Sequence, residues 1–164
     1  CLPNEAQWEY ACRAGTETAY HFGNDITPER ANYGNSIKKT VPVKSLPAND
    51  WGLYEMHGNV LEWCADGPRT YDEAPQQDPE GPAGSTRRAV RGGSWFYHAW
   101  GARSAYRGAR DPGFAVGILG DLGFRLCLRS SGQVRPGGPS GASRAQRATD
   151  FFSRPGKSGD KRKK

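Results

Sequence analysis

Glycine and proline interrupt this sequence too often for long helices. There are 22 glycines and 12 prolines among the 164 residues, about one position in five. Glycine weakens a helix through its backbone entropy, and proline breaks it because it lacks an N–H group. A chain of this kind disfavours a helical bundle and favours short strands joined by many turns.

Charge is divided unevenly along the chain, whose formal net charge is +6. Residues 130–164 hold nine Lys and Arg against two Asp, which gives +7 and leaves −1 for residues 1–129. Only Phe151 and Phe152 are bulky and apolar in this stretch, too few to offset the entropy of ordering it. We therefore expect a folded domain over 1–129 and a disordered basic tail over 130–164. The tail could attach to nucleic acid or acidic surfaces, but an inert extension is favoured, and no specific nucleic-acid partner is expected.

No stretch of the sequence is apolar enough to predict a membrane span. The mean hydropathy is −0.80, and no apolar run approaches the roughly 18 to 20 residues that a bilayer requires. The chain begins at Cys1 rather than Met, so the lack of a leader leaves its location open.

Cysteine and histidine are too dispersed to predict a zinc site. No Cys-x-x-Cys spacing occurs among the four cysteines, which are Cys1, Cys12, Cys64 and Cys127. Buried thiols and a disulfide both remain open for them. The histidines His21, His57 and His98 are equally scattered, and we expect structural or surface roles for the first two.

Local signals predict one helix and a few strands. Asn4 and Gln7 have the spacing of a capping box, and an apolar stripe follows them, so we predict a helix up to residue 14 that Gly15 terminates. Strands are expected within residues 51–64, 89–95 and 123–128, with an edge strand at 40–43. Four prolines in residues 68–86 predict a long loop of the kind that flanks or covers a site.

Five spaced motifs resemble a single family. They are Leu-Pro-Asn-Glu-Ala-Gln-Trp-Glu-Tyr-Ala from Leu2, Gly-Leu-Tyr-Glu-Met-His-Gly-Asn-Val-Leu-Glu-Trp from Gly52, Arg-Gly-Gly-Ser-Trp from Arg91, Arg-Ser-Ala-Tyr-Arg from Arg103 and Gly-Phe-Arg-Leu from Gly123. Together they resemble the formylglycine-generating enzyme (sulfatase-modifying factor) family over residues 2–128. The resemblance implies an α+β fold, a variant of the C-type lectin fold with a small antiparallel sheet. It also implies that the family's N-terminal part is missing and that Cys1 is a truncation point.

The resemblance does not carry the family's catalytic cysteines. In the enzymes, two cysteines shortly after the Gly-Gly-Ser motif bind copper and oxidise the substrate. The matching positions here are Tyr97 and Ala102, and no cysteine lies between Trp95 and Arg125. Without thiolates there is neither a soft copper site nor a nucleophile, so we predict no copper and no oxidase activity. Cys127 lies at the wrong place to replace them and is predicted to be a strand thiol.

The segment after Trp95 also resembles the variable region of diversity-generating retroelement proteins, several of which use this scaffold. In that system, randomised Asn codons encode many residues but never Trp, Met, Lys, Glu or Gln. The residues that fit as variable, ligand-binding positions are Phe96, Tyr97, His98, Gly101, Gly108, Gly113, Phe114, Ala115, Val116, Gly117, Ile118, Leu119, Gly120 and Asp121. The interleaved fixed residues, interpreted as scaffold, are Trp95, Trp100, Arg103, Arg107, Pro112 and residues 123–125.

Two interpretations of this segment remain. The apolar run over residues 114–119 fits a buried strand, but its two glycines and the preceding Asp-Pro-Gly favour an exposed binding patch. On that basis we predict a non-catalytic ligand-binding protein that displays a hypervariable surface to an unidentified protein or surface ligand. Phe96, Tyr97, His98 and Phe114 would be its anchors. The alternative is a divergent enzyme of the same family.

One structural metal is also implied by the family resemblance. Asn59 and Glu62 lie in the motif that supplies oxygen ligands to calcium in the family. The alternative is that Asn59 stabilises a tight turn and Glu62 pairs with an arginine. A second family site near Asn32 and Tyr33 lacks its usual acid among residues 34–43.

Overall fold

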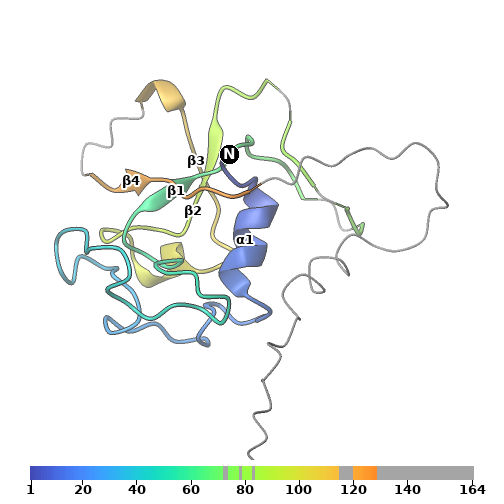
Figure 1. Ribbon diagram of the computed structural model, residues 1–164. Coiled ribbons are helices and arrows are strands. Elements are labelled where there is room, and N and C mark those ends of the chain that lie inside the picture. Colours follow the sequence, from blue (N-terminus) through green and yellow to red (C-terminus); the bar gives the residue numbers. More distant parts are fainter. Residues whose placement is uncertain (72–73, 78, 83, 115–119, 129–164) are drawn as a thin grey trace, which may run out of the picture. The chain divides into compact units, whose positions relative to one another are not determined.

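The computed structural model (Figure 1) describes residues 1–71, 74–77, 79–82, 84–114 and 120–128. The apolar run at 115–119 and the basic tail at 130–164 lie outside the described residues, so the exposed patch and the disordered tail stay predictions. Among the described helices, none is long and apolar enough to span a membrane.

Helix α1, Glu5–Arg13, begins at the predicted capping box. The Asn4 side chain accepts a hydrogen bond from the backbone N–H of Gln7 at 2.8 Å, and the Gln7 side chain accepts one from the backbone N–H of Asn4 at 3.0 Å. These bonds satisfy donors that a helix start otherwise leaves free. The helix ends one residue earlier than expected, because Ala14 already adopts the left-handed conformation (φ 47°) and closes the last turn onto Tyr10.

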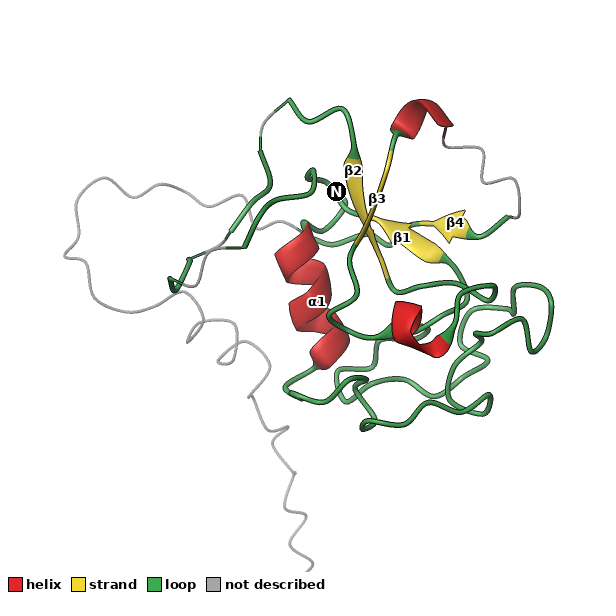
Figure 2. Cartoon of the chain, turned by 180° about the vertical axis from the view of Figure 1, so that it is seen from behind, coloured by secondary structure: helices red, strands yellow, loops and turns green. Residues whose placement is uncertain are grey.

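A four-stranded sheet lies beside α1 (Figure 2). Its strands are β1 (Leu61–Trp63), β2 (Arg88–Arg91), β3 (Gly108–Arg110) and β4 (Leu122–Gly123), in the order β3-β2-β1-β4. The predicted antiparallel sheet is wrong in one respect, since β4 pairs parallel with β1 while the other two pairs are antiparallel. The chain leaves β3 at one edge and crosses to the opposite edge before β4, and a crossover of this kind allows parallel pairing.

Two predicted strands are shorter than their sequence pattern or absent. Residues 124–128 alternate like a strand, but only Leu122–Gly123 pair with β1, because β1 itself is three residues long. Residues 40–43 form no strand. Residues 99–102 and 112–114 instead form short 3-10 helices, η1 (Ala99–Ala102) and η2 (Pro112–Phe114).

The core is small and lies between α1 and the sheet. One packed cluster consists of Trp8, Cys12, Met56, Cys64 and Ala89, and other apolar residues of the described chain, such as Tyr20, Leu61 and Val90, are buried as well. Much of the remaining chain forms loops that polar side chains hold in place. Asn49, for example, accepts bonds from the backbone N–H groups of residues 51 and 53 at 3.0 Å and donates to the carbonyl of residue 11 at 2.8 Å. Such bonds take the place of regular ladders in a loop-rich fold.

Candidate ligand-binding face

The turn after β2 sets the position of the predicted variable segment. Gly93 has φ +71°, and a Cβ there would lie 2.7 Å from the carbonyl oxygen of Gly101, so only glycine fits. The carbonyls of Trp95 and Tyr97 then accept hydrogen bonds at 2.7 Å from the N–H groups of residues 35 and 34. The backbone of residues 95–97 is therefore fixed against a distant loop.

Large aromatic side chains lie exposed on this segment. Phe96 is 49% exposed and Trp100 is 56% exposed, and His98 between them is exposed as well. The Trp100 ring meets the Tyr106 ring edge-on at 5.0 Å, and Tyr106 also meets Tyr97 at 6.1 Å. Exposed aromatic residues that lie close together are typical of binding surfaces.

A pocket of about 420 Å³ is also lined by Tyr97 and Tyr106. Two cations, Arg87 and Arg110, and the carboxylate of Asp111 lie in its lining as well. Arg110 donates to the Tyr97 hydroxyl at 3.1 Å. Burial raises the pKa of Tyr106, so its hydroxyl stays protonated and can donate a hydrogen bond. The remaining lining residues are Leu61, Val90, Gly108 and Ala109.

The structure separates the predicted variable residues into three groups. Those exposed on the surface are Phe96, His98, Gly113 and Gly120, and those half-buried at the pocket are Tyr97 and Gly108. Ala115, Val116, Gly117, Ile118 and Leu119 lie outside the described residues, and of Phe114 only the backbone, in η2, is described. Gly101 and Asp121 form the third group, which is buried.

The burial of Gly101 and Asp121 argues against a ligand contact at these two predicted positions. The Tyr97 ring covers Gly101, and a Cβ at that position would lie 2.9 Å from the ring. Asp121 is 4% exposed; its carbonyl accepts a bond from Leu61 at 2.8 Å and its carboxylate lies 3.7 Å from Arg110. Close packing excludes both residues from a surface contact.

Sequence reasoning also missed residues that belong to this face. Trp100 was expected to be scaffold, yet it is among the most exposed aromatic residues described. Arg87 and Arg110 carry no local signal, because they meet only through the antiparallel pairing of β2 with β3, in which Arg88 faces Arg110. A position that does not vary can still be exposed, so Trp100 could have been considered for the binding face as well as for the scaffold.

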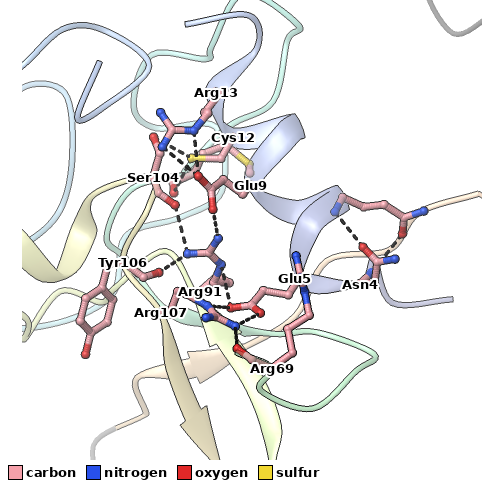
Figure 3. A network of polar contacts seen from close by, with 12 residues as sticks. Asn4, Glu5, Glu9, Cys12, Arg13, Arg69, Arg91, Ser104, Tyr106 and Arg107 are labelled. Carbon is pink, nitrogen blue, oxygen red and sulfur yellow. Dashed lines mark hydrogen bonds and ion pairs between the residues drawn. The ribbon is translucent and has the colours of Figure 1, made fainter. Parts of the chain in front are cut away.

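A network of buried charges lies between α1 and the residues behind this face (Figure 3). Arg91 is fully buried and pairs with both Glu5 and Glu9 of α1. Its guanidinium also donates to the carbonyls of Ser104 and Tyr106. The segment that carries Tyr106 is thus hydrogen-bonded to the Arg91 guanidinium, whose charge is neutralised by the two glutamates of α1.

A second arginine strengthens this connection. Arg107 donates two hydrogen bonds to the Glu5 carboxylate, from Nε at 2.7 Å and from a terminal nitrogen at 2.6 Å. It also donates to the Arg69 carbonyl at 2.8 Å. Bidentate pairs of this kind fix geometry as well as charge. The backbone on either side of Tyr106 is therefore tied to α1, which supports a rigid face.

Tyr97 and Ala102, the two residues that the family resemblance places at the positions of the catalytic cysteines, have different surroundings. Tyr97 lines the pocket, whereas Ala102 is fully buried. Cys12 lies behind Ala102, with its sulfur 3.8 and 3.9 Å from the two ring nitrogens of His57. A thiol and an imidazole this close could in principle act as a nucleophile and its base.

Cys12 and His57 are held in their neutral forms. Burial raises the pKa of Cys12 to about 12, and burial lowers the pKa of His57 to about 4. Both ring nitrogens are also occupied, since Nδ1 donates to the Ala102 carbonyl at 2.7 Å and Nε2 accepts from the His21 N–H at 3.0 Å. A nucleophilic thiolate and its base are therefore not formed here.

The Glu62 carboxylate, which is predicted to bind calcium, is hydrogen-bonded at both oxygens. Arg125 binds both carboxylate oxygens, at 2.5 and 2.7 Å, and the Trp8 indole donates to one of them at 2.7 Å. This is the arginine pairing that the sequence left as the alternative. Across the described ranges, no group of three or more His, Cys, Asp or Glu side chains could hold a metal ion.

Asn59 lies instead beside Asn32. The Asn59 side-chain oxygen accepts from the Val41 N–H at 2.9 Å and from the Asn32 amide at 3.3 Å. Asn32 is fully buried, and its own side-chain oxygen has no hydrogen-bond partner among the described residues. A buried oxygen without a partner is costly unless another group satisfies it.

The fold and this face define a loop-rich α+β domain with exposed aromatic side chains beside a pocket. Residues 1–130 match the family described as the sulfatase-modifying factor enzyme 1-like domain, and the chain belongs to that family.

Individual relatives share most of the folded part. Variable protein 1 of Treponema denticola, a solved structure, is 37% identical to this chain and superposes with a TM-score of 0.69. The match covers 76% of this chain and 45% of variable protein 1. The formylglycine-generating enzyme of Streptomyces coelicolor is 37% identical over 141 residues, 76% of this chain and 45% of the enzyme. The serine/threonine-protein kinase pkn1 of Chlamydia caviae is 41% identical over 129 residues, 76% of this chain and 20% of the kinase. The chain thus spans less than half the length of each.

Proposed function

We propose that this protein is a non-catalytic ligand-binding protein, a variable protein of the diversity-generating retroelement type. The observation that carries the proposal is the exposure of two aromatic side chains, Phe96 and Trp100, near a pocket lined by Tyr97 and Tyr106, with the Trp100 ring 5.0 Å from that of Tyr106. The similarity to variable protein 1 of Treponema denticola supports it. The scaffold would be the variant of the C-type lectin fold that the family resemblance implies.

Binding on this face would use side chains held on a rigid backbone. Phe96 and Trp100 offer apolar area that is already partly ordered by ring contacts, which lowers the entropy lost when a ligand binds. The pocket lining holds Arg87, Arg110 and Asp111, and Arg110 already lies 3.7 Å from the buried Asp121 carboxylate, which leaves the exposed Arg87 as the cation that a ligand would meet. We therefore propose a ligand that presents an acidic group next to an aromatic or aliphatic one.

The divergent-enzyme alternative has less support. The family resemblance assigns Tyr97 and Ala102 to the positions of the copper ligands, neither of which is a thiol, and the Cys12 thiol is neutral and buried. The alternative requires aldehyde formation on a cysteine-containing sulfatase peptide in the presence of copper and oxygen, and we expect none.

Calcium also remains a proposal, with a different ligand set from the one expected. The unpartnered, buried oxygen of Asn32 next to the amide of Asn59 supports a site for a hard cation there, since calcium prefers amide and carbonyl oxygens. The Glu62 carboxylate, occupied by Arg125, is not part of this proposal.

Selection from a random peptide library tests the proposed function and its ligand class. Peptides selected on the immobilised full chain should be enriched in Asp or Glu next to an aromatic residue. Arg87→Gln, at the exposed pocket rim, should weaken them about tenfold, whereas Lys38→Gln, an exposed cation in a loop away from the pocket lining, should not. Failure to select any peptide, or equal effects of the two substitutions, would contradict the proposal.

A further inference from the structure

Two cysteines from opposite ends of the described chain meet at the start of α1. The sulfur of Cys1 lies 3.5 Å from the sulfur of Cys127, although 126 positions separate them in sequence. The backbone N–H of Cys127 donates to the carbonyl of Cys1 at 2.9 Å, so the contact does not depend on the thiols alone. Figure 1 shows the blue start of the chain beside the orange segment that follows β4.

The other two cysteines have the opposite character. Cys12 and Cys64 are fully buried, and burial raises the pKa of each thiol, that of Cys12 to about 12. Only a thiolate attacks a disulfide, so both are protected from exchange. Cys1 is exposed and Cys127 is partly exposed, so an oxidant can reach this pair alone among the four.

We propose that Cys1 and Cys127 form a disulfide that links the residues just before α1 to the segment after β4. The Cys1 thiolate attacks a low-molecular-weight disulfide such as oxidised glutathione and releases one glutathione thiolate. The Cys127 thiolate then attacks the mixed disulfide at Cys1 and releases the second. The two cysteines lose two electrons and two protons, and the oxidant becomes two thiols.

The backbone already holds the pair in place for this step. A disulfide needs its sulfurs about 2.05 Å apart, so the contact must close by about 1.5 Å, which side-chain rotation can supply while the backbone bond is kept. No movement of α1 or the sheet is required.

The bond would secure the segment that the sheet leaves unpaired. Beyond β4, residues 124–128 expose Phe124, Leu126 and Leu128. The contacts described for this segment run through Arg125, which pairs with Glu62, and through Cys127. Closing so long a loop removes much of the freedom of the unfolded chain, and the stabilisation expected from a disulfide grows with loop length.

The test uses the full chain, oxidised with glutathione and digested without reductant. We expect one linked peptide pair that contains Cys1 and Cys127, while Cys12 and Cys64 are alkylated only after denaturation. Oxidation should raise Tm by roughly 5 to 15 °C, and a reductant should reverse the rise. Glutathione adducts on separate cysteines, cross-linked dimers, or an unchanged Tm would each overturn the proposal.

A matched variant keeps the number of thiols and moves one of them. Cys127→Ser with Leu128→Cys moves the thiol to the neighbouring position, which is fully exposed. In an extended segment, successive side chains point to opposite sides, so the new thiol should point away from Cys1. This double variant should form no internal bond and show no rise in Tm. Equal cross-linking from position 128 would show that proximity at Cys127 is not what selects the pair.

Discussion

At the scale of single residues, burial rather than sequence motif decides which polar groups of this protein are reactive. His57 illustrates this, since its ring contacts Ala102, His21 and Cys12 and both ring nitrogens are hydrogen-bonded. A charge on this ring would have neither water nor a carboxylate to stabilise it among the contacts described. The ring therefore acts as a neutral bridge between the loops around it.

His57 predicts how stability depends on pH. Its pKa is about 4 in the folded protein and about 6.5 when unfolded, so the unfolded state takes up the proton first as pH falls. The stability that the neutral ring provides is present above pH 6.5 and is lost between about pH 6.5 and 4, by roughly 3 kcal/mol. Denaturant titrations at several pH values measure it, and His57→Gln should flatten the curve. A ring that titrates near 6.5 by NMR would refute this prediction.

Glu62 predicts an effect that is independent of calcium. Replacing Glu62 by Gln removes the charge that Arg125 and Trp8 share, which should cost roughly 1.5 to 3 kcal/mol of unfolding free energy. The loss should be the same with calcium or with a chelator. Asn32→Ala is the matched variant, because calcium should raise the Tm of the wild type and not of this variant. A loss at Glu62 seen only in calcium would restore the ligand role to its carboxylate.

At the scale of elements, local sequence signals predict those structures that depend on local contacts. The capping box of Asn4 and Gln7 predicts α1 to within a residue, because both bonds form within one turn. The alternation of residues 124–128 predicts a strand that does not form, because a strand also needs a partner and β1 ends too soon. The parallel pairing of β4 and the meeting of Arg87 with Arg110 at the pocket depend on distant pairings, which no local pattern encodes.

The turn after β2 gives a prediction at this scale. Gly93→Ala should destabilise the domain by roughly 1 to 3 kcal/mol, since alanine would be strained at φ +71° and its Cβ would collide with the Gly101 carbonyl. Gly113→Ala is the control, because that residue is exposed and has no positive φ. Urea denaturation of both variants measures the difference. Equal stability of the two would mean that the turn can rearrange.

At the scale of the whole molecule, buried ion pairs connect the segment behind the pocket to α1. Arg91 and Arg107 bond the segment behind the pocket to the carboxylates of α1, so that the aromatic face does not depend on a large apolar core. Such a scaffold tolerates changes at its exposed positions while the backbone stays fixed. This division of roles would suit the variable binding surface that we propose.

The central claim is that Phe96 and Trp100 serve binding and not stability. The double variant Phe96→Ala/Trp100→Ala should lower the unfolding free energy by less than about 2 kcal/mol, because both side chains are about half exposed, whereas a buried aromatic costs about 3 to 5 kcal/mol. Tyr10→Ala/Trp51→Ala is the control, since these rings are equally exposed and in contact at 5.0 Å, but lie on α1 and the loop near residue 51.

The most direct measurement compares the Kd of a selected peptide for the wild type and these two variants, alongside their Tm. We predict that the Phe96→Ala/Trp100→Ala variant stays folded and binds roughly thirtyfold more weakly or worse, while the Tyr10→Ala/Trp51→Ala control binds like the wild type. If the Phe96→Ala/Trp100→Ala variant is unfolded, the two side chains serve stability and the claim is contradicted. A folded one with undiminished binding would show that the ligand binds elsewhere.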